Sequence, residues 1–532
     1  MTGRRVTAVL VIVVLAAVAA LFRFLSLQGF SNDHFLHLVA AQQIVLGEWP
    51  TKDFADPGMP LMYGASAAAQ ALLGRTLLSE GVLVAVAFGA AAALTAVTVL
   101  QLTSSLTLAV AATLFEVAIF PRSYGYPKLL LYAAGFAVYG WYLARPDGRR
   151  LAAMAGFAAV AFLFRHDHGV YLGGGACLAA LLAPDTGLWR ARVHRAAICA
   201  GTFGLFLLPY LLYVQAYEGL GAYLGTGIAF STREAERQGR VWPSPFSATE
   251  PTQVVLLYLF HLLPLAAAAT VVANCRDQAA RILPIAAVGV LVNLSFIRDP
   301  LTTRLPDAVV PAVVLGAWLA ARAWSAPRFR AIWIPATAVV ALIAVSSVVV
   351  VGNTPGELDR MGLSGRWDEL PRLVGERASE LRERFSARQM PTRTVEALQP
   401  FFAYLDRCTM PTDRLLVTGF FPEVPYYARR PFAGGQSTFL EGYFGSEQNQ
   451  RQVLDRLDRQ VVPFVFVPSD GGFEELARGF PLVSGYVKSR FRELTVVPID
   501  EERHMTIEVN RTLGARGIDP ETGWPCFSER GR

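Results

Sequence analysis

VTAVLVIVVLAAVAALFRFL, residues 6–25, is an apolar run that directly follows Arg4 and Arg5. Its length suits an α-helix that crosses a hydrocarbon core of ~30 Å. Basic residues before an apolar run also begin a secretory signal. This run has no convincing small-residue cleavage site, however, and further apolar runs follow it. We therefore interpret residues 6–25 as a retained signal-anchor helix with a cytoplasmic N-terminus.

The composition of the whole chain is that of a membrane protein. Of its 532 residues, 53% are hydrophobic and only 17% are charged. The mean hydropathy of +0.38 lies outside the range of ordinary soluble domains. The net charge of +6 comes mostly from arginines spread over short loops, so nucleic-acid binding has little support. A polytopic α-helical membrane protein follows from these values.

Eleven apolar runs are long enough to cross, or nearly cross, a membrane. A twelfth run, residues 59–74, is shorter, contains Pro60 and ends at Arg75, so we expect an interfacial helix there. Eleven spans place the loops that are dense in Lys and Arg in the cytoplasm, as the positive-inside rule requires. The segment 26–80 and everything after Val351 then lie outside. The expected spans are residues 6–25, 81–101, 106–120, 128–144, 151–164, 169–183, 196–216, 253–273, 281–297, 305–322 and 331–351.

The last third of the chain changes character. DRLLVTGFF and VVPFVFVPS are typical of short buried strands, and QRQVLDRLDRQ between them is typical of a helix. We expect a transmembrane domain over residues 1–354, with its first external loop at 26–80, and a small extracytoplasmic soluble α/β domain over 355–532. Cys408 and Cys526 would share an oxidising compartment there, which leaves two alternatives, a disulfide or two free thiols.

Charged and aromatic polar residues gather in loops that the topology places at the outer face. Charges at a membrane boundary are costly to desolvate, so they usually pair or serve a ligand. A carboxylate beside several cations at headgroup depth suits chemistry on a phosphate-bearing lipid, because cations neutralise a departing phosphate while the acid accepts a proton. The alternatives are that these charges satisfy one another or anchor helix ends. Besides the first loop, the residues are Arg122, Tyr124, Tyr126, Lys128, Arg165, His166, Asp167, His168, Arg298, Asp299, Arg304 and Asp307.

The first external loop contains SNDHFLHLVAAQQIVLGEWPTKDFADPGMPLMYG, residues 31–64. It resembles the corresponding loop of GT-C glycosyltransferases, the group of protein O-mannosyltransferases, aminoarabinose transferases and bacterial arabinofuranosyltransferases. In that group the loop opens with a catalytic Asp, runs through a juxtamembrane helix to a Gly, and continues roughly as Pro-x-x-Asp-Phe before a Pro-rich entry to a second juxtamembrane helix. The matching positions here are Asp33, Gly47, Pro50, Asp53, Phe54, Pro57 and Pro60.

The resemblance implies an enzyme with a GT-C fold in a bacterial cytoplasmic membrane. Its reaction would move a sugar from a polyprenyl-phosphate donor to a hydroxyl of a cell-envelope glycan, lipid or protein acceptor. A single displacement with Asp33 as general base would invert the anomeric centre. The Asp-x-Asp metal motif of some relatives is absent from this loop, so a divalent metal stays an open alternative that no motif supports, and no other cofactor is implied.

Further site residues are expected in two roles. Asp56 is a candidate for acceptor binding or orientation, with a turn-stabilising role before Pro57 as the alternative, and His34, His166 and Asp167 are candidates for the same role. His34 and His37 by themselves are too few for a metal site. The candidates for the donor phosphate are Lys128, Arg165, Arg304, Arg122 and Arg298.

A flippase or transporter of lipid-linked sugars is the main alternative. Such proteins place polar groups at the bilayer midplane, on broken helices. Here the spans are apolar, with Glu116 as the main charged exception, and the charge lies at one face. The pattern therefore favours the glycosyltransferase.

Overall fold

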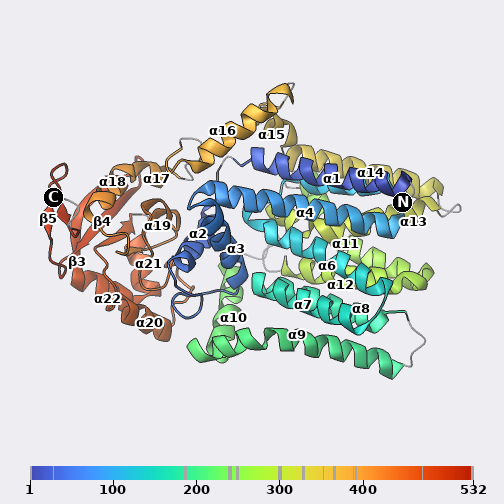
Figure 1. Ribbon diagram of the computed structural model, residues 1–532, viewed down its shortest axis with the longest axis horizontal. Helices are drawn as coiled ribbons and strands as arrows, with labels where there is room; N and C mark the ends of the chain where they lie inside the picture. Colours follow the sequence, from blue (N-terminus) through green and yellow to red (C-terminus); the bar gives the residue numbers. More distant parts are fainter. Residues whose placement is uncertain are drawn as a thin grey trace. The chain divides into compact units, whose positions relative to one another are not determined.

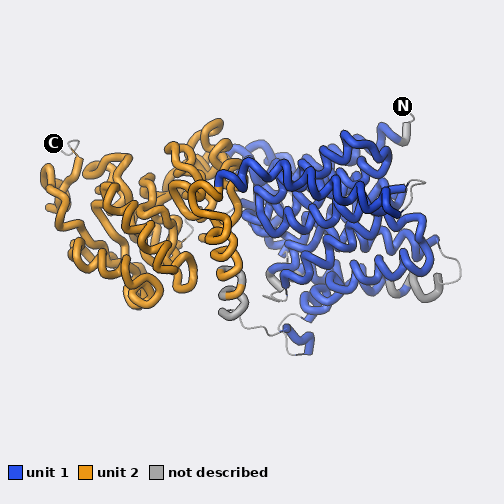
Figure 2. Tube along the Cα trace, turned by 90° about the horizontal axis from the view of Figure 1, so that it is seen from below, with its two compact units in different colours: residues 1–27, 81–213, 234–377 blue, residues 28–80, 214–233, 378–532 orange. Residues whose placement is uncertain are grey.

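The computed structural model is helical, with a small sheet near the C-terminus, and it divides into two compact units (Figure 2). The first unit comprises residues 1–27, 81–213 and 234–377, and the second comprises residues 28–80, 214–233 and 378–532. The structure describes residues 3–27, 29–184, 189–237, 242–246, 251–296, 302–325, 330–351, 353–363, 367–386, 389, 392–469 and 471–528.

The first unit is a bundle of long, roughly aligned helices (Figure 1). Its helices are α1 (Gly3–Leu25), α4 (Leu77–Thr103), α5 (Leu106–Ala118), α6 (Tyr126–Ala144), α7 (Gly148–Phe164), α8 (His166–Leu182), α9 (Trp189–Tyr217), α11 (Pro251–Asn274), α12 (Ala279–Ser295), α13 (Val309–Ser325), α14 (Arg330–Val351), α15 (Thr354–Arg360) and α16 (Leu370–Arg382). One end of each of α4, α9 and α16 belongs to the second unit. Short 3₁₀ turns are η1 (Ser123–Gly125), η2 (Arg276–Gln278), η3 (Thr302–Ala308) and η5 (Trp367–Glu369).

Seven helical segments among the described residues are long and apolar enough to cross a membrane. The eleven expected spans all overlap helices. Helices α5, α7 and α8 are shorter, at 13, 17 and 17 residues, and the 19-residue α6 is not among the seven segments either. The crossing of these four helices therefore stays a prediction. The segments of sufficient length are Arg5–Leu25, Leu77–Thr103, Trp189–Tyr217, Pro251–Asn274, Arg276–Ser295, Arg304–Ser325 and Thr337–Arg360.

Small residues allow close helix packing in the bundle. Helix α8 packs against α7 and α12, and α12 also packs against α11. At Gly175 of α8, an added Cβ would lie 2.7 Å from a Val288 methyl carbon and 2.6 Å from the Tyr139 hydroxyl. Glycine is therefore needed there for the close approach, as at many helix contacts in membrane proteins.

The second unit combines residues 28–80 and 214–233 with the C-terminal region. Its helices are α2 (Asn32–Val45), α3 (Pro60–Leu73), α10 (Leu220–Arg237, largely in this unit), α17 (Arg393–Ala397), α18 (Gln399–Cys408), α19 (Glu423–Ala428), α20 (Glu447–Leu457), α21 (Gly472–Gly479) and α22 (Pro481–Arg490). Its strands are β1 (Leu415–Val417), β2 (Phe464–Pro468), β3 (Phe491–Pro498), β4 (His504–Asn510), β5 (Gly517–Ile518) and β6 (Pro525–Cys526).

The predicted buried strands are confirmed as β1 and β2, and the predicted helix between them as α20. The sheet has the order β1-β2-β4-β3, with β1 parallel to β2 and the other pairs antiparallel. Strand β2 is buried throughout because both of its faces are covered. Phe464 and Phe466 contact Phe401 of α18, whereas Val465 and Val467 pack in a cluster with residues of α20, α21 and α22.

Helices α2 and α3 pack against each other, and α2 also packs against α19. Phe54, in the connection between α2 and α3, is buried in a cluster with Val39, Tyr63 and Phe432. With 14 residues, α3 is about 21 Å long, which is short for a membrane span and compatible with the expected interfacial helix. The segment of residues 28–80 is thus an integral part of the second unit.

Candidate functional site

Asp33 lies in the first turn of α2, and its side chain is partly exposed. Within the described chain its carboxylate has no hydrogen bond or ion pair. A carboxylate at a helix N-terminus is stabilised by the helix dipole and the unpaired backbone N–H groups of the first turn. Asp33 therefore combines an available carboxylate with a position at the start of a rigid helix.

His34, the next residue, is completely buried and engaged. Its Nε2 lies 2.7 Å from Oε1 of Glu80, and the hydroxyl of Ser66 donates a hydrogen bond of 3.1 Å to the same oxygen. The ring also makes an edge-on contact with Phe30, at 4.6 Å between centroids. These contacts join α2, α3 and the first turn of α4, so His34 serves as an anchor for the loop that carries Asp33.

Asp56 is 2% exposed and stabilises the entry to α3. Its Oδ1 accepts hydrogen bonds from the backbone N–H groups of Gly58 and Met59, at 2.9 and 2.8 Å. These are the contacts of the turn-stabilising alternative. The other oxygen lies 3.4 Å from the hydroxyl of Tyr223. Burial, and to a lesser extent Asp56, raises the pKa of Glu218 to about 7.

In the first unit, the expected cations are paired with carboxylates. Lys128, in the first turn of α6, forms an ion pair with Asp307 of η3. Arg165, between α7 and α8, holds Asp167 in a bidentate contact, with Nε–Oδ1 at 2.9 Å and Nη2–Oδ2 at 3.2 Å. Both cations are thus paired with a carboxylate. This is the arrangement expected from the alternative in which neighbouring charges satisfy one another.

The same cluster contains a buried histidine and tyrosine. Nε2 of His168 lies 3.7 Å from Oδ1 of Asp167, and its Nδ1 contacts the hydroxyl of Tyr132 on α6. Asp167 also accepts a hydrogen bond of 2.9 Å from the backbone N–H of His168. Asp167 therefore fixes the N-terminal turn of α8 and positions Arg165.

The other predicted residues of this unit have mixed surroundings. Arg122 contacts the hydroxyl of Tyr124 and lies over its ring, 5.8 Å from the centroid. His166 stacks on Phe162 at 4.0 Å, and its Nδ1 lies 2.8 Å from the Phe162 carbonyl oxygen. Arg304 is partly buried in η3, whereas Arg298 lies outside the described residues.

The prediction therefore divides between the two units. Asp33, His34 and Asp56 belong to the second, and the predicted cations, with His166 and Asp167, belong to the first. Glu80, Ser66 and Glu218 were missed as partners. The signal for Glu80 was an acid at the start of an otherwise apolar helix, since such a group needs a partner.

Cys408 and Cys526 are joined by a disulfide, which connects α18 to β6. These two residues and Asp519 form the one group of three or more metal-ligand side chains in the described parts of the chain. The disulfide occupies both sulfurs, and Asp519 accepts a hydrogen bond of 3.0 Å from Arg407. This group is therefore a structural crosslink with an adjacent ion pair.

No protein-family model matches the chain, and no curated protein sequence matches it. Among solved structures, the chain is similar to the crystal structure of the Archaeoglobus fulgidus oligosaccharyltransferase in complex with zinc and sulfate. The TM-score is 0.48 and the identity 10%, over 91% of this chain and 71% of that chain. A similarity of this degree assigns neither residues nor an activity.

Proposed function

We propose that this chain is a membrane glycosyltransferase of the GT-C type. It would transfer a sugar from a polyprenyl-phosphate donor to an acceptor hydroxyl at the outer face of a bacterial cytoplasmic membrane. The observation that carries the proposal is the contrast within the first loop. Asp33 has an available carboxylate at the start of α2, while His34 beside it is tied to Glu80.

In the proposed reaction, Asp33 accepts the proton of the acceptor hydroxyl as its oxygen attacks the anomeric carbon. The bond between that carbon and the phosphate oxygen breaks, and polyprenyl phosphate departs with the electron pair. One displacement inverts the anomeric centre. Negative charge grows on the leaving phosphate, so cations that contact it lower the barrier. Lys128, Arg165, Arg304, Arg122 and Arg298 are the proposed source of those cations.

The test is transfer activity of the purified full chain in detergent, with a panel of polyprenyl-phosphate sugars and crude envelope acceptor. Asp33→Asn keeps the size of the side chain but removes the base, so turnover should fall by roughly 10²–10⁴ with donor binding retained. Asp53→Asn is the matched control, because an amide oxygen can still accept the 2.9 Å hydrogen bond from the Trp49 N–H.

Turnover of Asp33→Asn near the wild-type value would exclude Asp33 as the base. If no donor of the panel is consumed although a control enzyme uses it, the flippase or transporter alternative is favoured. That alternative is then tested with labelled polyprenyl-phosphate sugar in sealed vesicles, where it predicts movement of the intact lipid between leaflets.

A further inference from the structure

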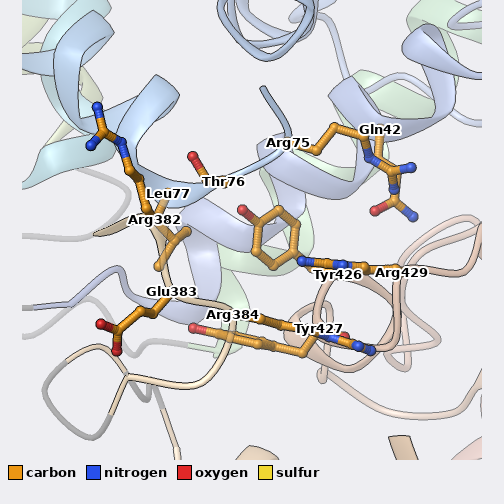
Figure 3. A pocket seen from close by; sticks show the side chains of 10 residues that line it. All are labelled: Gln42, Arg75, Thr76, Leu77, Arg382, Glu383, Arg384, Tyr426, Tyr427 and Arg429. Atoms are coloured by element: carbon orange, nitrogen blue, oxygen red, sulfur yellow. The ribbon is translucent and has the colours of Figure 1, made fainter. Parts of the chain in front are cut away.

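The second unit contains an arginine-rich pocket outside the predicted site residues (Figure 3). The empty space within the pocket, part of which is open solvent, amounts to about 370 Å³. Its walls come from α2, the turn between α3 and α4, the end of α16 with the residues after it, and α19. The lining residues that carry the argument are Gln42, Arg75, Arg384, Tyr426, Tyr427 and Arg429.

The charge of this pocket is not balanced by the protein. Four arginines line it, together with one acid, Glu383. Arg384 also pairs with Asp406, which Arg430 shares at 3.6 Å. At least two of the four positive charges of the pocket are therefore uncompensated. In Figure 3 the Glu383 carboxylate points away from the Tyr426 ring. The pocket therefore presents an excess of two positive charges to a ligand.

Two of the arginines, Arg75 and Arg429, have exposed side chains that lie close enough to repel each other. Among the described residues, the side chains of Arg75 and Arg429 form no hydrogen bond or ion pair. Burial lowers the pKa of Arg75, and the positive charge of Arg429 lowers it further, while Tyr426 has the opposite effect. Two cations that repel each other are stabilised when an anion binds between them.

Arg384, which also lines the pocket, has an unused donor. Its Nε donates a hydrogen bond of 2.7 Å to the Tyr427 carbonyl oxygen, which orients the guanidinium. Its Nη2 is buried and has no hydrogen-bond partner in the described structure. A buried N–H group of a charged side chain without a partner is costly, and an anion oxygen would satisfy it.

We propose that this pocket binds a phosphate monoester. A phosphate monoester carries about −1.5 to −2 charges at neutral pH and three strong acceptor oxygens. It thus matches the excess of two charges and offers an oxygen to each of Arg75, Arg384 and Arg429. A carboxylate has one charge and suits a single guanidinium. The phosphate could belong to a lipid headgroup or to a soluble molecule, and this binding does not depend on the proposed glycosyl transfer.

Binding is measured on the full chain with two probes. Inorganic phosphate is titrated into detergent-solubilised protein by calorimetry, with acetate as the carboxylate comparison. Separately, the protein is reconstituted in phosphatidylcholine nanodiscs that contain phosphatidic acid, a lipid phosphate monoester, or phosphatidylglycerol, a phosphodiester of lower charge. Lipid retained by the protein is then quantified. The variants are Arg75→Gln, Arg429→Gln and their combination, and the control is Arg451→Gln on α20, whose partner is the exposed Glu447.

Each single variant should weaken binding by about 10- to 100-fold, the factor for one lost hydrogen bond to a charged group. The control should bind as the wild type does. Saturable binding of free phosphate indicates a soluble source, and selective retention of phosphatidic acid indicates a lipid source. Equal binding of acetate or phosphatidylglycerol, or equal binding by the wild type and the combined variant, overturns the proposal. The same measurements on Asp33→Asn should give wild-type binding, which separates this site from the transfer reaction.

Discussion

Asp33 and His34 are adjacent in the sequence but have opposite environments. Along a helix, consecutive side chains point about 100° apart, so one residue can face the core while the next faces outward. His34 is fully buried against Glu80 and Ser66, and Asp33 is partly exposed. At the residue scale, the first loop thus separates an anchor from an available acid.

His34→Ala should destabilise the protein. The substitution leaves the buried Glu80 with the Ser66 hydroxyl as its hydrogen-bond donor, and removal of one member of a buried pair costs about 3 kcal/mol or more. Thermal unfolding in detergent should show a lower Tm, while kcat measured below the transition should stay near the wild-type value. An unchanged Tm with a lost kcat would instead assign His34 to acceptor orientation.

Glu218 should make stability depend on pH. Its pKa rises from 4.5 in the unfolded reference to about 7 in the fold, so the folded state binds the proton more tightly. The contribution is therefore favourable at low pH and is lost as pH rises from about 4.5 through 7. Glu218→Gln should raise Tm relative to the wild type at pH 8, with little difference at pH 4.5. Equal Tm differences at both values would contradict this assignment.

At the scale of elements, the cations of the first unit are held by acids from the same cluster. Lys128 of α6 pairs with Asp307 of η3, and Arg165 pairs with Asp167 at the start of α8. A donor phosphate would have to join or displace these carboxylates. Desolvated ion pairs hold side chains in one arrangement. This is compatible with two roles, cations held in place for a donor phosphate and cations that only stabilise the fold.

The two roles of Lys128 are separated by removing its partner first. Asp307→Asn should keep donor affinity, because Lys128 retains its charge. Lys128→Gln in that background removes the cation without leaving a buried unpaired carboxylate, and should raise the donor KM by about 10- to 100-fold, as expected for lost hydrogen bonds to a charged group. If Asp307→Asn and the double variant with Lys128→Gln have the same donor KM, Lys128 has a structural role alone.

At the scale of the whole molecule, the disulfide between Cys408 and Cys526 bears on topology. Such bonds persist in oxidising compartments and are rare in the cytoplasm. This agrees with the proposed extracytoplasmic location of the C-terminal region, which shares the second unit with residues 28–80.

The proposed topology predicts export of the chain after Val351. An alkaline phosphatase fusion there should be active, whereas a fluorescent protein that matures only in the cytoplasm should stay dark. A fusion after Arg149, in a proposed cytoplasmic loop, is the control with the opposite pattern. A cytoplasmic signal after Val351 would contradict the proposed topology. It would also contradict the location of Asp33 at the outer face, which the proposed reaction requires.

The sequence by itself indicated that the eleven long apolar runs are helical, because a segment in hydrocarbon must satisfy its own backbone hydrogen bonds. It likewise determined β1, β2 and α20, since local hydrophobic patterns are read over a few residues. It also singled out Asp33 through the motif of the first loop. Local patterns carry no information on which distant residue a side chain meets.

Only the tertiary structure decided the partners. His34 meets Glu80, 46 positions away, Lys128 meets Asp307 across 179 positions, and the arginine pocket combines residues from four separate segments. Desolvation favours a partner for each buried charge, but many partners satisfy that requirement equally well. The choice among them follows from helix packing over the whole chain, and so do the roles of these residues.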